Sequence, residues 1–399
     1  MQHDPITNHP RWWRTSLTLA VAGAAAFSMS TLFSAMKPIL LTRFVEQLHT
    51  SETVAGFIVA LPFVGIALAS LLMRGRLLTA PYRRVACGFG LILIGCELLS
   101  AWLFAHLLVV ACLQFVSGIC VGILMGATSR YIATSKTPAQ LFGFVDMTAV
   151  LLMSFMVFAI GQSVASNGLT GGYLSAAIIC VVFFLALFCF RPQHQDAANQ
   201  ATMPTGQLGL SLRPLAIVSM GVLFITFSGL GFAFMFTMAA NLDMAYEVAS
   251  RNIGILLFAS AFACQAGGWA AARFGPQRPL ACAFVTCAIG WAVAIYTSNP
   301  TVFMLALIPA IFSLQFNFPI LLSYCGALDN QGRWAAVASP LITSGFAWAA
   351  IVAGLIVNQI GLHALAWTTG AGMVICLFLL WLANSQSVSE KEISPRPMH

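Results

Sequence analysis

Charged residues are scarce in this chain. Of its 399 residues only 7% are Asp, Glu, Lys or Arg, whereas 60% are hydrophobic, and 31 Phe stand against 6 Tyr. A soluble domain needs a polar surface, so this composition excludes most soluble folds. The chain also lacks HExxH, Walker and GxSxG motifs and has no paired carboxylates in any one of the loops predicted to be cytoplasmic. These gaps argue against an enzyme.

The cysteines have no metal-binding spacing. All eleven fall inside apolar runs, and no CxxC pair occurs. A cysteine in such a setting behaves as a small buried hydrophobe. We therefore expect neither a disulfide framework nor a metal site, and no cofactor.

What the chain does contain is long apolar runs. About 20 apolar residues cross a hydrocarbon core of about 30 Å, and backbone polar groups in lipid must bond within a helix. The sequence predicts an all-α integral membrane protein with twelve transmembrane helices over 15–41, 53–73, 84–105, 107–129, 140–163, 172–190, 214–240, 248–272, 279–298, 301–325, 335–360 and 364–383.

The basic residues divide unevenly between the two ends of these runs. Fifteen lie on the side of the termini, and only Lys37, Arg43 and Arg251 lie on or toward the other side. This asymmetry predicts that both termini are cytoplasmic and that the protein lies in a cytoplasmic (inner) membrane. We interpret the net charge of +7 as the signal that orients the helices in the membrane, so no nucleic-acid partner is expected. Arg11 to Arg14 before an Ala-rich run also resembles a signal peptide, but the apolar run is too long for one.

A polar stretch at 191–213, rich in Gln, Asn, Pro and Gly, divides the runs into six and six. It predicts an N-terminal six-helix bundle over 1–190, a cytoplasmic linker over 191–213, and a C-terminal bundle with a short tail over 214–399. Basic, glycine-containing loops recur at matching places, "GRLLTAPYRR" at 75–84 and "GWAAARFGPQR" at 268–278. A parallel repeat of this kind is typical of transporters.

The two loops resemble the loop signature of the major facilitator superfamily. The second-half copy carries Gly268, Arg273 and Gly275, and the first-half copy carries Gly75, Arg83 and Arg84. The resemblance implies that these residues act in gating. The family's acidic residue is replaced by Ala272 and Thr79. Two readings stay open: the arginines anchor the loops on the cytoplasmic side, or the glycines permit close helix approach while the arginines contact helix ends.

In the fourth run, "LQFVSGICVG" resembles a stretch in which the family places an arginine four residues before a glycine. Gln114 takes that position, ahead of Gly118 and Gly122. The fifth run also lacks the glycine–proline element of drug/proton antiporters. Both departures argue against a multidrug exporter.

Three charged residues fall well inside the apolar runs, where polar groups are costly and are candidates for function. Lys37 is a candidate substrate contact, the alternative being a side chain that snorkels to the interface. Glu97 and Asp146 are candidate proton-coupling groups. Glu97 could instead be a structural, hydrogen-bonded acid, and Asp146 could form an ion pair with Arg130.

The family resemblance places the first, fourth, seventh and tenth runs around a central cavity. Those runs supply the candidate substrate contacts Gln114, Phe227, Gln315 and Asn317. Amides beside aromatic rings, as in "LQFNFPILL", suit an uncharged or amphipathic organic solute. The alternative is that these amides join helices to one another. Asp329 and Arg333, four residues apart, are expected to form an ion pair that braces a loop.

Together these features predict a monomeric secondary transporter that moves a small organic solute by alternating access, with protons as the candidate coupling ion and the lipid bilayer as its environment. A drug or metabolite exporter, for example of a siderophore-like compound, is one alternative. A membrane receptor or scaffold that transports nothing is another.

The predicted topology can be checked by labelling. We expect a Gln200→Cys variant in the linker to react with a membrane-impermeant maleimide only from the cytoplasmic side, because the fifteen basic residues on the side of the linker favour a cytoplasmic location. Labelling in intact and permeabilised cells, measured above the wild-type background, distinguishes the sides. Reaction from outside would contradict the division into six and six helices.

Overall fold

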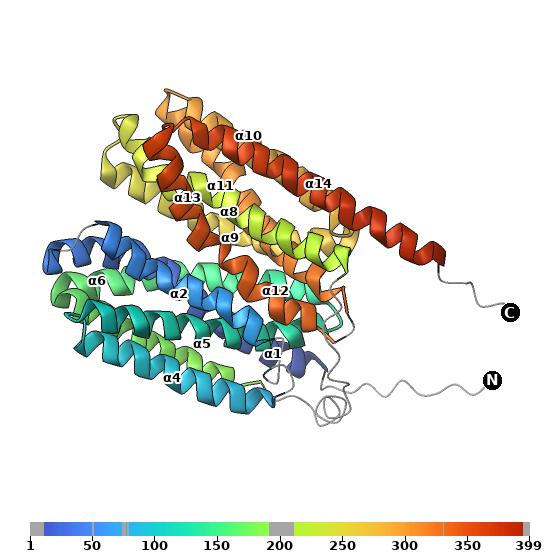
Figure 1. Ribbon diagram of the computed structural model, residues 1–399, viewed down its shortest axis with the longest axis horizontal. Coiled ribbons are helices and arrows are strands. Elements are labelled where there is room, and N and C mark those ends of the chain that lie inside the picture. Colours follow the sequence, from blue (N-terminus) through green and yellow to red (C-terminus); the bar gives the residue numbers. More distant parts are fainter. Residues whose placement is uncertain are drawn as a thin grey trace.

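The computed structural model shows an all-helical chain (Figure 1). It describes residues 12–49, 52–73, 77, 80–190, 211–329 and 331–393, without the side chains of a few of them. The helices are α1 (Trp12–Leu48), α2 (Glu52–Leu72), α4 (Tyr82–Trp102), α5 (Leu107–Ala133), α6 (Pro138–Leu187), α8 (Leu212–Asn241), α9 (Tyr246–Phe274), α10 (Gln277–Tyr296), α11 (Pro300–Gly326), α12 (Arg333–Thr343), α13 (Gly345–Gln359) and α14 (Ala364–Ile393).

Within the described ranges, eleven stretches are long and apolar enough to cross a membrane. One of them, α6, has 50 residues. A straight helix of that length would measure about 75 Å, more than twice a hydrocarbon core. The α6 stretch therefore holds two crossings, and the predicted twelve-helix membrane fold is confirmed.

The chain reverses inside α6 at Gly168, whose φ of 60° and ψ of −145° are not helical. The Ser163 hydroxyl donates to the Gly171 carbonyl at 2.8 Å, although eight residues of straight helix would span about 12 Å. The Gln47 amide oxygen of α1 accepts the Leu169 backbone N–H at 3.0 Å. Gly168 is needed because its φ is positive and because a Cβ would collide with the Gln47 amide.

The penultimate crossing, predicted as one helix over 335–360, has an irregular turn at Ser344 between α12 and α13, where the backbone keeps helical angles and the Ser344 N–H bonds to the Pro340 carbonyl at 3.1 Å. Pro340 lies one helical turn before Ser344, and a proline has no N–H to bond the carbonyl four residues earlier. The Ala336 carbonyl therefore has no helical partner. Gly126 of α5 approaches it closely enough that a Cβ would lie 2.5 Å from the oxygen.

The helices pack as two groups (Figure 1). The blue and green helices α1, α2, α4, α5 and α6 contact one another, as do the yellow to red helices α8 to α14. Both described ends, Trp12 and Ile393, lie on the same side of the molecule, here called the terminal side. The two groups are in contact toward the terminal side and diverge toward the opposite side (Figure 1). The division at 191–213 stays a prediction, because residues 191–210 lie outside the described part.

The two groups meet on the terminal side along a seam of glycines. A Cβ on Gly268 of α9 would collide with the Ala139 carbonyl of α6, and one on Gly143 of α6 would lie 2.8 Å from the Cys264 carbonyl. Glycine at these positions lets the two backbones touch. The structure thus places Gly268 in a close helix contact, as one of the two open readings expected.

The loop after α11 completes the seam. Gly332 has a φ of 65°, and a Cβ there would collide with the Arg130 carbonyl of α5. The Arg130 side chain donates from Nε to the Gln331 carbonyl at 3.2 Å. Asp329 and Arg333, which were expected to form an ion pair, are joined by a bond from the Arg333 backbone N–H to the Asp329 carboxylate at 3.0 Å. Asp329 therefore caps α12, and its burial raises the pKa of its carboxyl despite these bonds.

Replacing Gly268 tests the seam. We expect Gly268→Leu to force α9 and α6 apart, because the new side chain has no space beside the Ala139 carbonyl. Hydrogen–deuterium exchange should rise in the first turns of α6 and of α12. The matched control is Gly254→Leu in the same helix, where a Cβ meets nothing within 4 Å. Equal exchange in the two variants would contradict a tightly packed seam.

Candidate functional site

Glu97 lies at the centre of a buried polar cluster between α4 and α5. Its carboxyl group accepts hydrogen bonds from the Ser117 hydroxyl at 2.7 Å and from the Gln114 amide at 3.3 Å to each oxygen. The same Gln114 nitrogen lies 3.3 Å from the Ser100 hydroxyl. Glu97 is 0% exposed, so these bonds replace its contact with water.

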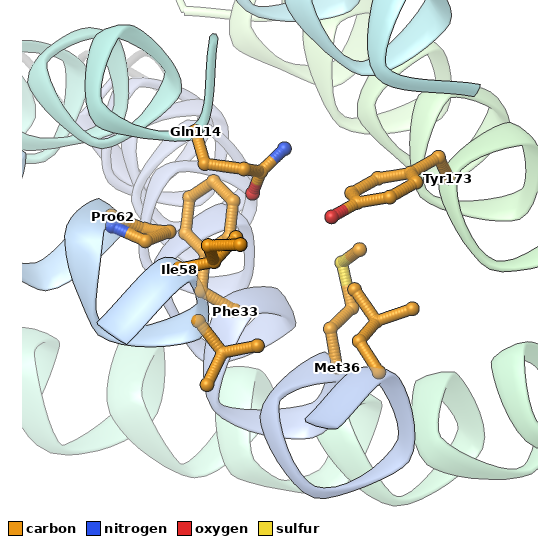
Figure 2. Close-up of a pocket in the computed structure, with 8 residues that line it drawn as sticks. Phe33, Met36, Ile58, Pro62, Gln114 and Tyr173 are labelled. Carbon is orange, nitrogen blue, oxygen red and sulfur yellow. The ribbon is translucent and has the colours of Figure 1, made fainter. Parts of the chain in front are cut away.

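A small cavity lies next to this cluster, on the other side of Gln114 (Figure 2). It is enclosed by α1, α2, α5 and α6 and lined by Phe33, Met36, Leu40, Ile58, Val59, Pro62, Gln114 and Tyr173. The Gln114 amide and the Tyr173 hydroxyl point into it from opposite walls. The space open to the centre of a water is only about 10 Å³, which is room for one water molecule. In this conformation the cavity is too small for an organic solute.

The crossing of α2 and α5 sets the position of Gln114. A Cβ on Gly118 would collide with the Pro62 carbonyl, and one on Gly122 would lie 2.5 Å from Ala69. The two helices therefore touch one turn and two turns beyond Gln114. This contact directs Gln114 between the cavity and Glu97, at the position where the family signature has an arginine.

Asp146 lies in a different place, on the face of α6 that meets α9. It is 5% exposed, and its Oδ2 atom has no hydrogen-bond partner among the described residues. The Cys264 thiol of α9 is within hydrogen-bonding reach of its carboxyl group. The alternative that Asp146 pairs with Arg130 finds no support here, because Arg130 reaches the loop after α11.

The candidates on α8 and α11 point in several directions. Phe227 packs against Gly372 of α14, so its ring faces a neighbouring helix. Phe316 lines a surface groove, whereas Phe318 meets Phe27 of α1 edge-on at 6.4 Å. Asn317 is 0% exposed, and neither atom of its amide has a partner within the described part of the chain. Gln315 is half-buried.

Other predicted site residues are placed only in part. Lys37 lies in α1, and its side chain is outside the described residues, as is Gly75. Arg83 and Arg84 are exposed in the first turn of α4. The Arg273 guanidinium lies 5.6 Å from the Trp269 ring and 5.7 Å from the Phe274 ring. Gly275 ends α9 with a φ of 74°, which favours glycine.

Sequence reasoning missed Tyr173 and Cys264. With 6 Tyr against 31 Phe, the chain uses a phenol where a hydroxyl is needed, and a buried Tyr usually serves a polar contact. That scarcity could have identified Tyr173. Cys264 had no such signal, because it faces Asp146 only through the contact of α9 with α6.

Two groups of membrane-spanning helices that meet on one side and hold buried carboxyl groups are the arrangement expected of a membrane transporter. The description "Major Facilitator Superfamily" fits the chain, since that family's sequence profile matches residues 18–328. The chain belongs to the major facilitator superfamily of secondary transporters, which are not enzymes.

Solved structures of the same fold agree with this assignment. The proton:xylose symporter XylE bound to 6-bromo-6-deoxy-D-glucose matches with a TM-score of 0.71 and 16% identity, over 93% of this chain and 95% of that one. The human organic anion transporter MFSD10 gives 0.69 and 18%, over 93% and 100%. The E. coli fucose:proton symporter FucP gives 0.68 and 15%, over 92% and 99%. No curated protein matched the chain.

The Glu97 cluster should contribute to stability. We expect Ser117→Ala to lower the free energy of unfolding by about 1 kcal/mol, because it removes the shortest bond to a buried carboxyl group. Glu97→Ala should cost more, since it strands Gln114 and Ser117. Thermal unfolding in detergent measures both. Thr148→Val is the control, because that hydroxyl bonds only to its own helix at Phe144, and it should change little. Equal stability of all three variants would contradict a stabilising role for the Glu97 cluster.

Proposed function

We propose that this protein transports a small polar organic solute together with protons, and that Asp146 is the coupling group. The observation that carries the proposal is the position of Asp146 between the two helix groups. Its carboxyl faces α9 across the seam that closes the terminal side. It belongs to neither group's interior alone, so its surroundings depend on whether the seam is open.

The seam supports alternating access. On the terminal side, α6 meets α9, and α5 meets α12 and the loop before it, through backbone contacts at glycines. Access from that side requires these contacts to separate. The groups already diverge toward the opposite side (Figure 1). Exchange between these two arrangements would present a central solute to each side in turn.

Opening the seam changes the solvation of Asp146. In the closed seam the carboxyl is nearly inaccessible, and burying an unpaired charge is costly, so this arrangement favours the uncharged acid. Asp146 lies about 12 Å from the start of α6. Water entering an open seam reaches that depth and stabilises the carboxylate. Proton release is thereby tied to opening on the terminal side.

The solute class is inferred from the amides of α11. Asn317 holds a fully buried amide with no described partner, and Gln315, two residues earlier, is half-buried. Amides bind hydroxyl and carbonyl groups without requiring a charge. The sugar symporters and the organic anion transporter with the same fold suggest monosaccharides and organic anions as the first compounds to test.

The orientation is part of the proposal. The excess of Arg and Lys on the terminal side supports cytoplasmic termini in a cytoplasmic membrane. We also propose that the chain is divided into bundles over 1–190 and 214–399, which a cytoplasmic linker joins, and that the protein is a monomer.

Amide replacements test the coupling. In proteoliposomes with an imposed proton gradient, we expect Asp146→Asn to abolish accumulation of the transported solute while counterflow persists, because counterflow needs no net proton movement. Glu97→Gln is the matched control, since it changes a buried carboxyl that lies inside one helix group. It should retain accumulation. Loss of accumulation in Glu97→Gln alone would overturn the role of Asp146.

A further inference from the structure

A large apolar groove lies on the outer surface of α9, α10 and α11. Its volume is about 500 Å³, and its lining includes Phe262, Ala266, Pro279, Cys282, Thr286 and Phe316. Several of these side chains are exposed on membrane-spanning helices. The groove therefore faces lipid and is distinct from the cavity beside Gln114.

The groove lies on the terminal side of a close contact between α10 and α11. At Gly290 of α10 a Cβ would lie 2.7 Å from the Ala310 nitrogen of α11, so the two helices touch there. Pro309 precedes Ala310 and removes a helical bond from α11. The groove lies beside α10 from Thr286 to Pro279, on the terminal side of this contact. Phe316, whose carbonyl meets Gly267 of α9, lines the groove from α11.

The end of the groove nearer the terminal side is basic. Arg278, Cys282 and Thr286 are spaced by four residues, so they share one exposed face of α10, and the last two line the groove. Arg273 is exposed near the end of α9. No acidic residue occurs between Glu247 and Asp329, a stretch that includes nearly all of these three helices. An anion at this end would meet arginine and no carboxylate from α10 or α11.

We propose that the groove binds one anionic phospholipid of the surrounding leaflet, with an acyl chain along α10 and its phosphate on Arg278. From Arg278 to the contact at Gly290 is about 18 Å, close to the roughly 15 Å depth of one leaflet's hydrocarbon. A free phosphate would use only the arginine, and a neutral lipid only the groove. An anionic phospholipid uses both.

The lipid also touches the transport machinery. Ala266 and Phe316 line the groove, next in sequence to Gly267 and Asn317. The acyl chain thus packs against Ala266, one residue from Gly267, where α9 meets α11, and two residues from Gly268, where α9 contacts α6.

Lipid retention in nanodiscs tests the site. The protein is reconstituted in phosphatidylcholine with phosphatidylglycerol, released into detergent, and the lipid that stays bound is quantified by mass spectrometry. We expect phosphatidylglycerol to be enriched over phosphatidylcholine, with Arg278→Gln lowering that enrichment about fivefold. Arg83→Gln, an exposed arginine at the same level of α4, should leave it unchanged.

A second variant separates the groove from the charge. Ala266→Trp fills the groove and should remove bound lipid of both kinds, whereas Gly88→Trp on the exposed face of α4 should not. Thr286→Trp replaces Ala266→Trp if the latter fails to fold. Soluble glycerophosphoglycerol, which has no acyl chains, should not displace the lipid.

The other outcomes overturn the proposal. Unchanged enrichment in Arg278→Gln would show that Arg278 does not bind the phosphate. Lipid retention in the filled-groove variants would show that the acyl chain does not lie in the groove. Displacement by glycerophosphoglycerol would indicate an anion site alone. A dimer that dissociates in Ala266→Trp would show that a second copy occupies the groove.

Discussion

Helix α9 lies between α6 and α11 and meets the backbone of both through adjacent glycines. Gly267 faces the Phe316 carbonyl and Gly268 faces the Ala139 carbonyl. Water is absent from the hydrocarbon region, so helices there associate by close packing and not by the hydrophobic effect. Two neighbouring residues without side chains let one helix touch both partners. The seam, the surroundings of Asp146 and the outer groove all depend on this position of α9.

The two buried carboxyl groups are held in opposite ways. Glu97 receives hydrogen bonds from Ser117 and Gln114, which belong to its own helix group, so its surroundings do not change when the groups move. Asp146 keeps one oxygen without a described partner and faces the other group. Hydrogen bonding within one rigid unit suits a structural acid, whereas incomplete bonding at a moving interface suits an acid that exchanges protons.

Much of the fold could be predicted from the sequence, because membrane thickness sets the length of each apolar run and the basic residues identify one side. The irregular turn at Ser344 follows from Pro340 but was not predicted, since a proline inside a run does not show whether a helix kinks or ends. The candidate site was harder to predict from the sequence. Gln114 and Glu97 were identified separately, and their bond depends on how α4 and α5 are aligned. Phe227 was chosen because α8 faces the centre, yet periodicity did not show that its ring turns toward Gly372.

The irregular turn at Ser344 has a mechanical consequence. A continuous helix moves as one rod, so a displacement at one membrane surface is transmitted to the other. Here Pro340 removes one backbone hydrogen bond from the crossing, while α12 stays joined to α5 at Gly126. The half of this crossing that lies away from the termini therefore bends at a lower cost than it would in a helix with all its hydrogen bonds.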